Sequence, residues 1–189
     1  MAYPLEQIFL PVQRMQLEHD EKAHRDILSF SLHKRLKHMV LHFYKYAAKV
    51  TVACESQDVP AARHALLDAL IICLASANAL NLSLGRTIQV GDKTATLDDV
   101  AHALAKQVKH PDVCQSAARD LLLIGGRMAK VVESADHMEA GDPRGDMARL
   151  VPELTASVLA HLGRLDNSGI EQAVRTRLAA VEQKSIFGR

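Results

Sequence analysis

Asp68 is the residue of this sequence with the clearest chemical potential, because it places an ionisable side chain inside an apolar segment. From Ala65 to Ile72 its neighbours are otherwise alanine, leucine and isoleucine, so they surround the carboxylate on every side of a helix. A buried carboxylate stays charged only beside a cation, a metal or several hydrogen-bond donors. Two interpretations therefore stay open: Asp68 pairs with a lysine or arginine, or it holds a metal or a substrate.

Glu55 is a second acid that a helical hairpin brings toward Asp68, since it stands at the expected end of the preceding helix. Mg²⁺ and Mn²⁺ bind carboxylate oxygens and bridge them to substrate phosphates, so the two acids favour such an ion. Glu133 and Glu153, with Asp136 nearby, offer a second pair by the same reasoning. For this second pair, ordinary surface or helix-end acids are the favoured alternative.

His38, His42, Lys45 and Lys49 form a local basic face on one side of an expected helix. Such a face suits the phosphate oxygens of a substrate. His38 and His42 are also four residues apart, a spacing at which two imidazoles chelate a transition metal. A solvated helix face is the alternative for all four side chains.

The elements that must position these residues are helices. The chain has 189 residues, of which 48% are hydrophobic and only 4% aromatic, with no tryptophan, a composition that favours an all-α fold. Apolar residues recur every three or four positions over 31–56, which predicts one long amphipathic helix. Asp58 and Pro60 then open a second helix that runs to about residue 84, completing a hairpin.

The rest of the chain is also expected to be helical, with one ordered loop at 86–95. A short helix at 4–19 is kinked or divided by Pro11, and the charged stretch 18–25 is expected to be a hinge. Gly125-Gly126 permits close packing or a bend, and Pro152 interrupts a helix. Capping boxes are predicted at Thr96–Asp99 and Ser168–Glu171, and the tail after Gln183 is expected to fray. The further helices cover about 96–108, 112–139, 145–165 and 170–183.

Two segments suggest an internal repeat. Residues 49–56 resemble residues 127–134 at an offset of 78, and in each copy a Glu-Ser precedes a turn with a proline and a second helix bearing an acid. We therefore divide the chain into an N-terminal helical segment, 1–30, a first repeat with its loop, 31–96, and a second repeat, 97–189. The two repeats are expected to pack as one domain.

Charge and motifs exclude several classes of function. With 23 basic and 22 acidic side chains the net charge is +1, so no global field attracts nucleic acid or an anionic membrane. The apolar run 65–80 is short for a membrane span and is expected to be a buried helix. Three widely spaced cysteines and the lack of an export signal at the N-terminus favour the cytoplasm. The chain also lacks a phosphate-binding glycine loop, a Rossmann fingerprint and a nucleophile elbow.

The segments 42–84 and 121–174 resemble the MazG-like all-α nucleoside triphosphate pyrophosphohydrolases. In that family one helix carries E-x-x-E and the next carries E-x-x-D. Residues 49–55 resemble the first motif helix and residues 66–71 the second, with Glu55 and Asp68 at matching acids. Val52 and Ala65 stand where two further acids belong, and Lys130 replaces one in the second copy.

The resemblance implies a helical bundle of two MazG-like hairpin repeats and a Mg²⁺-dependent hydrolase that converts a nucleoside triphosphate to a monophosphate and pyrophosphate. It implies Mg²⁺, or Mn²⁺, on Glu55, Asp68, Glu133 and Glu153, and a nucleotide on the basic face. It also implies a homo-oligomer or an internal pseudo-dimer. The missing acids keep an alternative open, a non-catalytic assembly or ligand-sensing protein on the same scaffold. A third hypothesis is a histidine-rich metal protein that uses His38 and His42.

Overall fold

The computed structural model describes residues 5–91, 94–166 and 168–184, and the regular elements within these ranges are all α-helices. The all-α prediction is therefore confirmed. In chain order the helices are α1 (Glu6–Ala23), α2 (Arg25–Leu28), α3 (Leu32–Glu55), α4 (Val59–Leu80), α5 (Leu84–Thr87), α6 (Leu97–Ala105), α7 (Val113–Asp136), α8 (Pro143–Leu165) and α9 (Ile170–Glu182).

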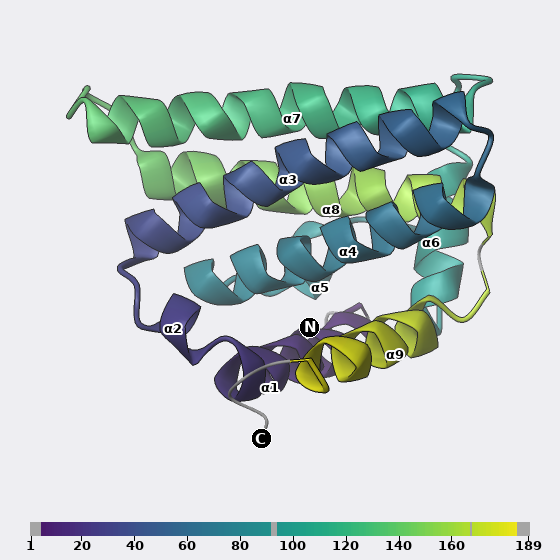
Figure 1. Ribbon diagram of the computed structural model, residues 1–189, viewed down its shortest axis with the longest axis horizontal. Helices are drawn as coiled ribbons and strands as arrows, with labels where there is room; N and C mark the ends of the chain where they lie inside the picture. Colours follow the sequence, from purple (N-terminus) through teal and green to yellow (C-terminus); the bar gives the residue numbers. More distant parts are fainter. Residues whose placement is uncertain (1–4, 92–93, 167, 185–189) are drawn as a thin grey trace.

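Four long helices form the centre of the molecule. α3 packs against α4 and α7, and α8 packs against the same two helices, so α3, α4, α7 and α8 make a bundle (Figure 1). The short α6 lies across α8, where Gly163 allows close approach: a Cβ added there would meet the carbonyl oxygen of Ala101 at 2.5 Å. One hydrophobic core continues from the bundle into the flanking helices.

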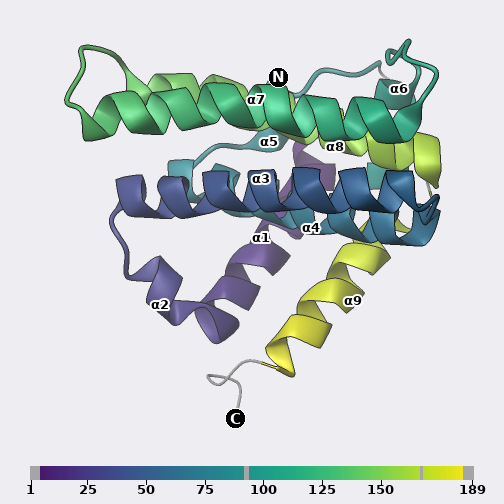
Figure 2. The same cartoon turned by 45° about the horizontal axis from the view of Figure 1, so that its top comes forward.

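The first and last long helices of the described chain lie together outside this bundle, on the side of α4. α1 contacts α4, α5 and α9, and α9 also contacts α4 (Figure 2). α9 lies beside the middle of α4, at Asp68, whereas α1 contacts α4 near its C-terminal end, at Asn78.

The local sequence explains the central hairpin. Ser31 and Asp58 cap α3 and α4 by accepting hydrogen bonds from the backbone N–H groups of Lys34 and Ala61, as expected for Asp58. α4 is apolar nearly all round, and by length and composition alone it qualifies as a membrane span. Most of that span is buried against neighbouring helices, so the prediction of a buried core helix is confirmed.

Two predicted interruptions of helices differ from the structure. The stretch 18–25, predicted as a hinge, is helical except at one residue: α1 continues through Pro11 to Ala23, and His24 alone separates it from α2. His19 and Ala23 are buried, so tertiary packing keeps this charged segment helical. Pro152 likewise lies inside an unbroken α8. The predicted fraying tail lies largely outside the described residues.

Of the two predicted capping boxes, the first is confirmed and the second is wrong. Thr96 and Asp99 exchange the expected hydrogen bonds at the start of α6. At α9 the capping residue is Gly169, with φ 64°, and no side chain of its own segment caps the helix. The carboxylate of Asp98 instead accepts hydrogen bonds from the N–H groups of Gly169 and Ile170, at 2.7 and 2.8 Å. A distant acid thus replaces the local cap.

The first helices of the two hairpins, α3 and α7, end alike. The sequence offset between their ends differs from the offset of 78 residues that the local sequence match suggested. α3 and α7 both have 24 residues, and both are followed by a residue with φ 55°, Gln57 and Met138, which are 81 positions apart. At that offset Glu55 corresponds to Asp136, not to Glu133. A common origin of the two hairpins stays a prediction.

Candidate functional site

The four predicted metal ligands lie on four different helices. Glu55 on α3, Glu133 on α7 and Glu153 on α8 are exposed, whereas the Asp68 side chain on α4 is only 11% exposed. Within the described chain these acids do not form a group of three ligands lying within 4.8 Å of one another. Their joint binding of Mg²⁺ stays a prediction that this arrangement does not favour.

The two acids of the second copy have nearby cations. Lys130 Nζ donates to Glu133 Oε2 at 2.6 Å, and Arg127 Nη1 donates to Glu153 Oε1 at 2.5 Å. Both pairs are largely exposed, and pairs of this kind contribute about 0–1 kcal/mol to stability. The two glutamates therefore have the surroundings of ordinary surface acids.

Asp68 forms a two-point ion pair with Arg177 of α9. The guanidinium Nε donates to one carboxylate oxygen at 2.6 Å and Nη2 donates to the other at 2.9 Å. Such a parallel pair is stronger and more directional than a single-point contact. The first interpretation of Asp68, an ion pair with a lysine or arginine, is the one found in the structure. Sequence analysis did not find Arg177, because 109 residues separate the partners.

The four residues of the predicted basic face differ in burial. His38 and His42 are half-buried and line a cavity, with their ring centroids 4.7 Å apart. Lys45 and Lys49 are exposed and lie over the ring of Tyr46, at 4.5 and 5.7 Å from its centroid. Lys45 Nζ also lies 3.2 Å from His42 Nδ1, so the histidine pair and the lysine pair are in contact, and their joint binding of a phosphate stays a prediction.

The cavity beside Asp68 is the candidate functional site. It has a volume of about 260 Å³ and lies between α1, α3, α4 and α9. Polar side chains from all four helices, and from His24 between α1 and α2, line part of the cavity. Apolar side chains line the remainder. The polar lining is Gln16, His19, Asp20, His24, His38, His42, Tyr46, Asp68 and Arg177, and the apolar lining includes Ile71, Ile72, Ala75, Leu178 and Val181.

Three of the lining residues gather at the end of α1. One ligand atom from each of His19, Asp20 and His24 lies within 4.8 Å of the other two, and the rings of the two histidines pack edge to face with centroids 5.3 Å apart. Sequence analysis missed this group because it treated the segment as a charged hinge. The available signal was the pair of histidines flanking an aspartate within one and a half helical turns.

A buried amide network holds α1 in the position that creates this group. Asn78 on α4 donates to the backbone oxygen of Gln13 and to Gln16 Oε1, both at 2.8 Å, and accepts from Gln13 Nε2 at 3.1 Å. Gln13 Oε1 also accepts from the N–H of Leu84 at 3.1 Å. Gln16 in turn hydrogen-bonds Asp20, so the network reaches the cavity wall.

The electrostatics of the cavity favour the neutral form of His42. Burial lowers the pKa of His42 to about 4, and the positive charges of Lys45, His38 and His24 act in the same direction. Burial also raises the pKa of Asp20 and raises that of Tyr46 to about 12. A neutral imidazole offers an unprotonated nitrogen to a ligand near neutral pH.

The low pKa of His42 predicts a specific loss of stability in acid. The pKa of His42 is about 4 in the folded state, below the ordinary value of 6.5. Between these two values only the unfolded state takes up the proton. The folded state is therefore fully stabilised by this group above pH 6.5, and that stabilisation is lost as the pH falls toward 4. Because solvent screens this partly buried ring, we expect His42→Gln to remove about 1–2 kcal/mol of that pH dependence. Urea unfolding of metal-free protein across this range measures the effect. His64→Gln, at an exposed position, should keep the original slope; equal slopes for H42Q and the unmodified protein would contradict the prediction.

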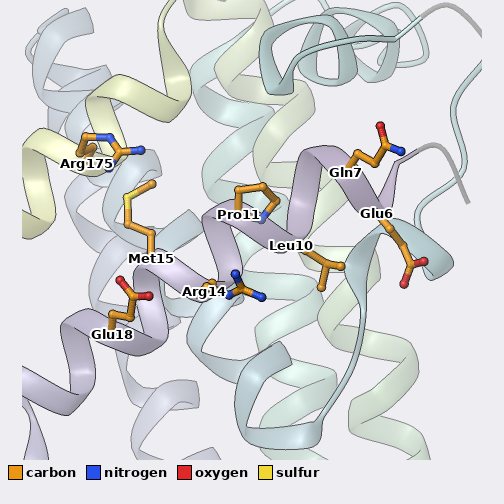
Figure 3. A pocket seen from close by; sticks show the side chains of 8 residues that line it. All are labelled: Glu6, Gln7, Leu10, Pro11, Arg14, Met15, Glu18 and Arg175. Atoms are coloured by element: carbon orange, nitrogen blue, oxygen red, sulfur yellow. The ribbon is translucent and has the colours of Figure 1, made fainter.

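A second hollow lies on the outer side of α1. This open groove of about 690 Å³ is lined by side chains of α1 with Arg175 of α9 at one end (Figure 3). Its charged groups are spread along the helix: Glu6 pairs with Arg86, and Arg175 pairs with Glu171. The groove is larger than the histidine-lined cavity but has no comparable convergence of polar groups.

Comparisons of this chain with protein-family models, curated proteins and solved structures return no match. The resemblance to MazG-like enzymes thus depends only on the residues quoted from the sequence. Function must be argued from the site itself.

Proposed function

We propose that this chain is a non-catalytic helical protein that binds a small ligand in the cavity between α1, α3, α4 and α9. The observation that carries the proposal is the two-point pair between Asp68 and Arg177. It occupies both oxygens of the one buried acid that a hydrolase of the MazG type would use for its metal.

The charges around Asp68 also argue against a magnesium–triphosphate site. Mg²⁺ is held by several carboxylates together with substrate oxygens. Here Lys45 acts electrostatically on the same region, Arg177 neutralises the carboxylate, and Glu55 is absent from the cavity lining. We infer that these residues do not suit Mg²⁺ with a nucleotide. Hydrolysis remains the competing proposal.

The cavity itself supports binding of something small and largely uncharged. Its volume of about 260 Å³ is below the roughly 300–1,000 Å³ typical of drug-sized sites. Asp68 and Arg177 cancel each other's charge, while the imidazoles of His38 and His42 supply hydrogen bonds above a wall of aliphatic side chains. This is the usual composition of a small-molecule site, an apolar surface with a few oriented polar groups.

One set of samples tests both parts of the proposal. With a panel of nucleoside triphosphates and Mg²⁺ or Mn²⁺, we expect pyrophosphate release no faster from the unmodified protein than from Asp68→Asn. With phenol as a neutral probe, we expect saturation-transfer NMR signals that disappear in Ala75→Leu, which fills the cavity, and persist in Leu41→Phe, whose position is 63% exposed. Metal-dependent pyrophosphate release that D68N abolishes would overturn the proposal, as would phenol signals that A75L leaves unchanged in a folded sample.

A further inference from the structure

His19, Asp20 and His24 offer the donors of a transition-metal site at the end of α1. Asp20 and His24 are four residues apart, and the N–H of His24 donates to the backbone oxygen of Asp20 at 2.9 Å, which keeps the two residues close together. The helix ends between them, and the backbone of His24 leaves helical geometry with φ −136°. Its ring thereby comes beside that of His19, and the ligand atoms of all three residues lie within 4.8 Å of one another.

A second observation points to a ligand on His19. Its side chain is only 4% exposed, and its Nδ1 lies 3.0 Å from Glu182 Oε1 of α9. A carboxylate on one ring nitrogen of a histidine fixes the tautomer and leaves the other nitrogen basic, which is the usual outer support of a metal-binding histidine. Bonding of Nδ1 to Glu182 leaves Nε2 as the nitrogen for a metal.

Asp20 is also supported from outside the group. The side chain of Gln16, 1% exposed, hydrogen-bonds the carboxylate, and Gln16 is itself held by Asn78 of α4. Arg35 of α3 acts on Asp20 electrostatically, but within the described chain the two form no ion pair and the Nε of Arg35 has no hydrogen-bond partner. The half-buried carboxylate of Asp20 thus has no ion pair of its own among the described residues.

We propose that His19, Asp20 and His24 bind one divalent transition-metal ion of the Zn²⁺ or Fe²⁺ class, with a remaining coordination position toward the cavity. Two imidazoles with one carboxylate suit these ions, whereas Mg²⁺ and Ca²⁺ select oxygen ligands. A metal about 2.0–2.2 Å from each donor requires donors roughly 3.3 Å apart, so small side-chain rotations complete the site. This inference rests on the proposed function and deepens it, because the remaining coordination position of the metal gives the neutral ligand of the cavity an anchor.

Calorimetric titration of chelator-treated full-length protein with Zn²⁺ tests the site. We expect one ion per chain, and at about 100 times Kd a rise in Tm of roughly 5–10 °C. Co²⁺ in place of Zn²⁺ should show the visible absorption of a site with nitrogen ligands. Asp20→Asn and His24→Ala should each weaken Zn²⁺ binding at least about tenfold, whereas His64→Ala, a matched change at an exposed histidine of α4, should leave it unchanged.

Two further variants keep the test decisive. Glu182→Gln on α9 alters only the support of His19, so it should weaken binding by about 10- to 100-fold while the chain stays folded by circular dichroism. His38→Ala should leave the stoichiometry at one. Loss of binding in H38A but not in H24A would overturn the assignment in favour of the His38–His42 pair, and unchanged Zn²⁺ affinity in both D20N and H24A would overturn it altogether. Phenol binding without Zn²⁺ binding would remove the metal site and leave the proposed function standing.

Discussion

Replacing Arg177 by methionine should lower the free energy of unfolding by about 2–4 kcal/mol. The change keeps most of the aliphatic stem but leaves Asp68, 11% exposed, without its cation. Removing one partner of a buried pair typically costs about 3–5 kcal/mol, and the 33% exposure of Arg177 places this pair toward the lower part of that range. Urea denaturation followed by circular dichroism measures the change.

A double-mutant cycle separates the ion pair from general damage to α9. Asp68→Leu combined with Arg177→Met should recover most of the stability lost in R177M, because replacing both partners leaves no unpaired buried charge. Arg175→Met is the matched control: this neighbouring arginine of α9 forms an exposed pair with Glu171, so its loss should change stability by less than about 0.5 kcal/mol. If R177M costs no more than R175M, Asp68 does not depend on this partner.

Replacing Asn78 by leucine should cost about 2–4 kcal/mol. Leucine has nearly the same shape, so the cost comes from polar groups and not from a cavity. Gln13 and Gln16, 4% and 1% exposed, lose hydrogen bonds that water cannot replace, and each unsatisfied buried group costs about 1–3 kcal/mol. The loss concerns the contact that holds α1 against α4.

Hydrogen exchange distinguishes this local effect from a general weakening. In N78L we expect faster exchange of the amides of α1 than of α7, since α1 depends on the amide network and α7 lies on the far side of the bundle. The control is Gln107→Leu, an amide at an exposed position, which should leave both stability and exchange unchanged. Equal acceleration in α1 and α7 would show that the network does not specifically anchor α1.

The acids that the MazG-like resemblance suggests as metal ligands have other surroundings in the bundle. Glu133 and Glu153 pair with cations on the surface, and the helix ends match Glu55 with Asp136 rather than with Glu133. The register from local similarity was three residues away from the register of the helices. Short matches between helices are prone to such shifts, because neighbouring turns resemble one another.

The sequence by itself determined the helical class, the central hairpin and its local caps. Periodicity, Asp58 at the start of α4 and the Thr96–Asp99 box all act over three or four residues, so they can be recognised without knowledge of the fold. The sequence also singled out Asp68, since an acid within an apolar helix needs a partner whatever the tertiary structure is.

Only the tertiary structure decided what those residues contact. Arg177 is 109 positions from Asp68, Glu182 is 163 from His19, and Asp98 caps a helix 71 positions away. The first two pairs meet because α1 and α9 pack together against α4, and the third because α6 packs against α9. That packing depends on burial of apolar surface, which is non-directional and leaves no pairwise signal in a single sequence. The cavity and its histidines are products of that packing.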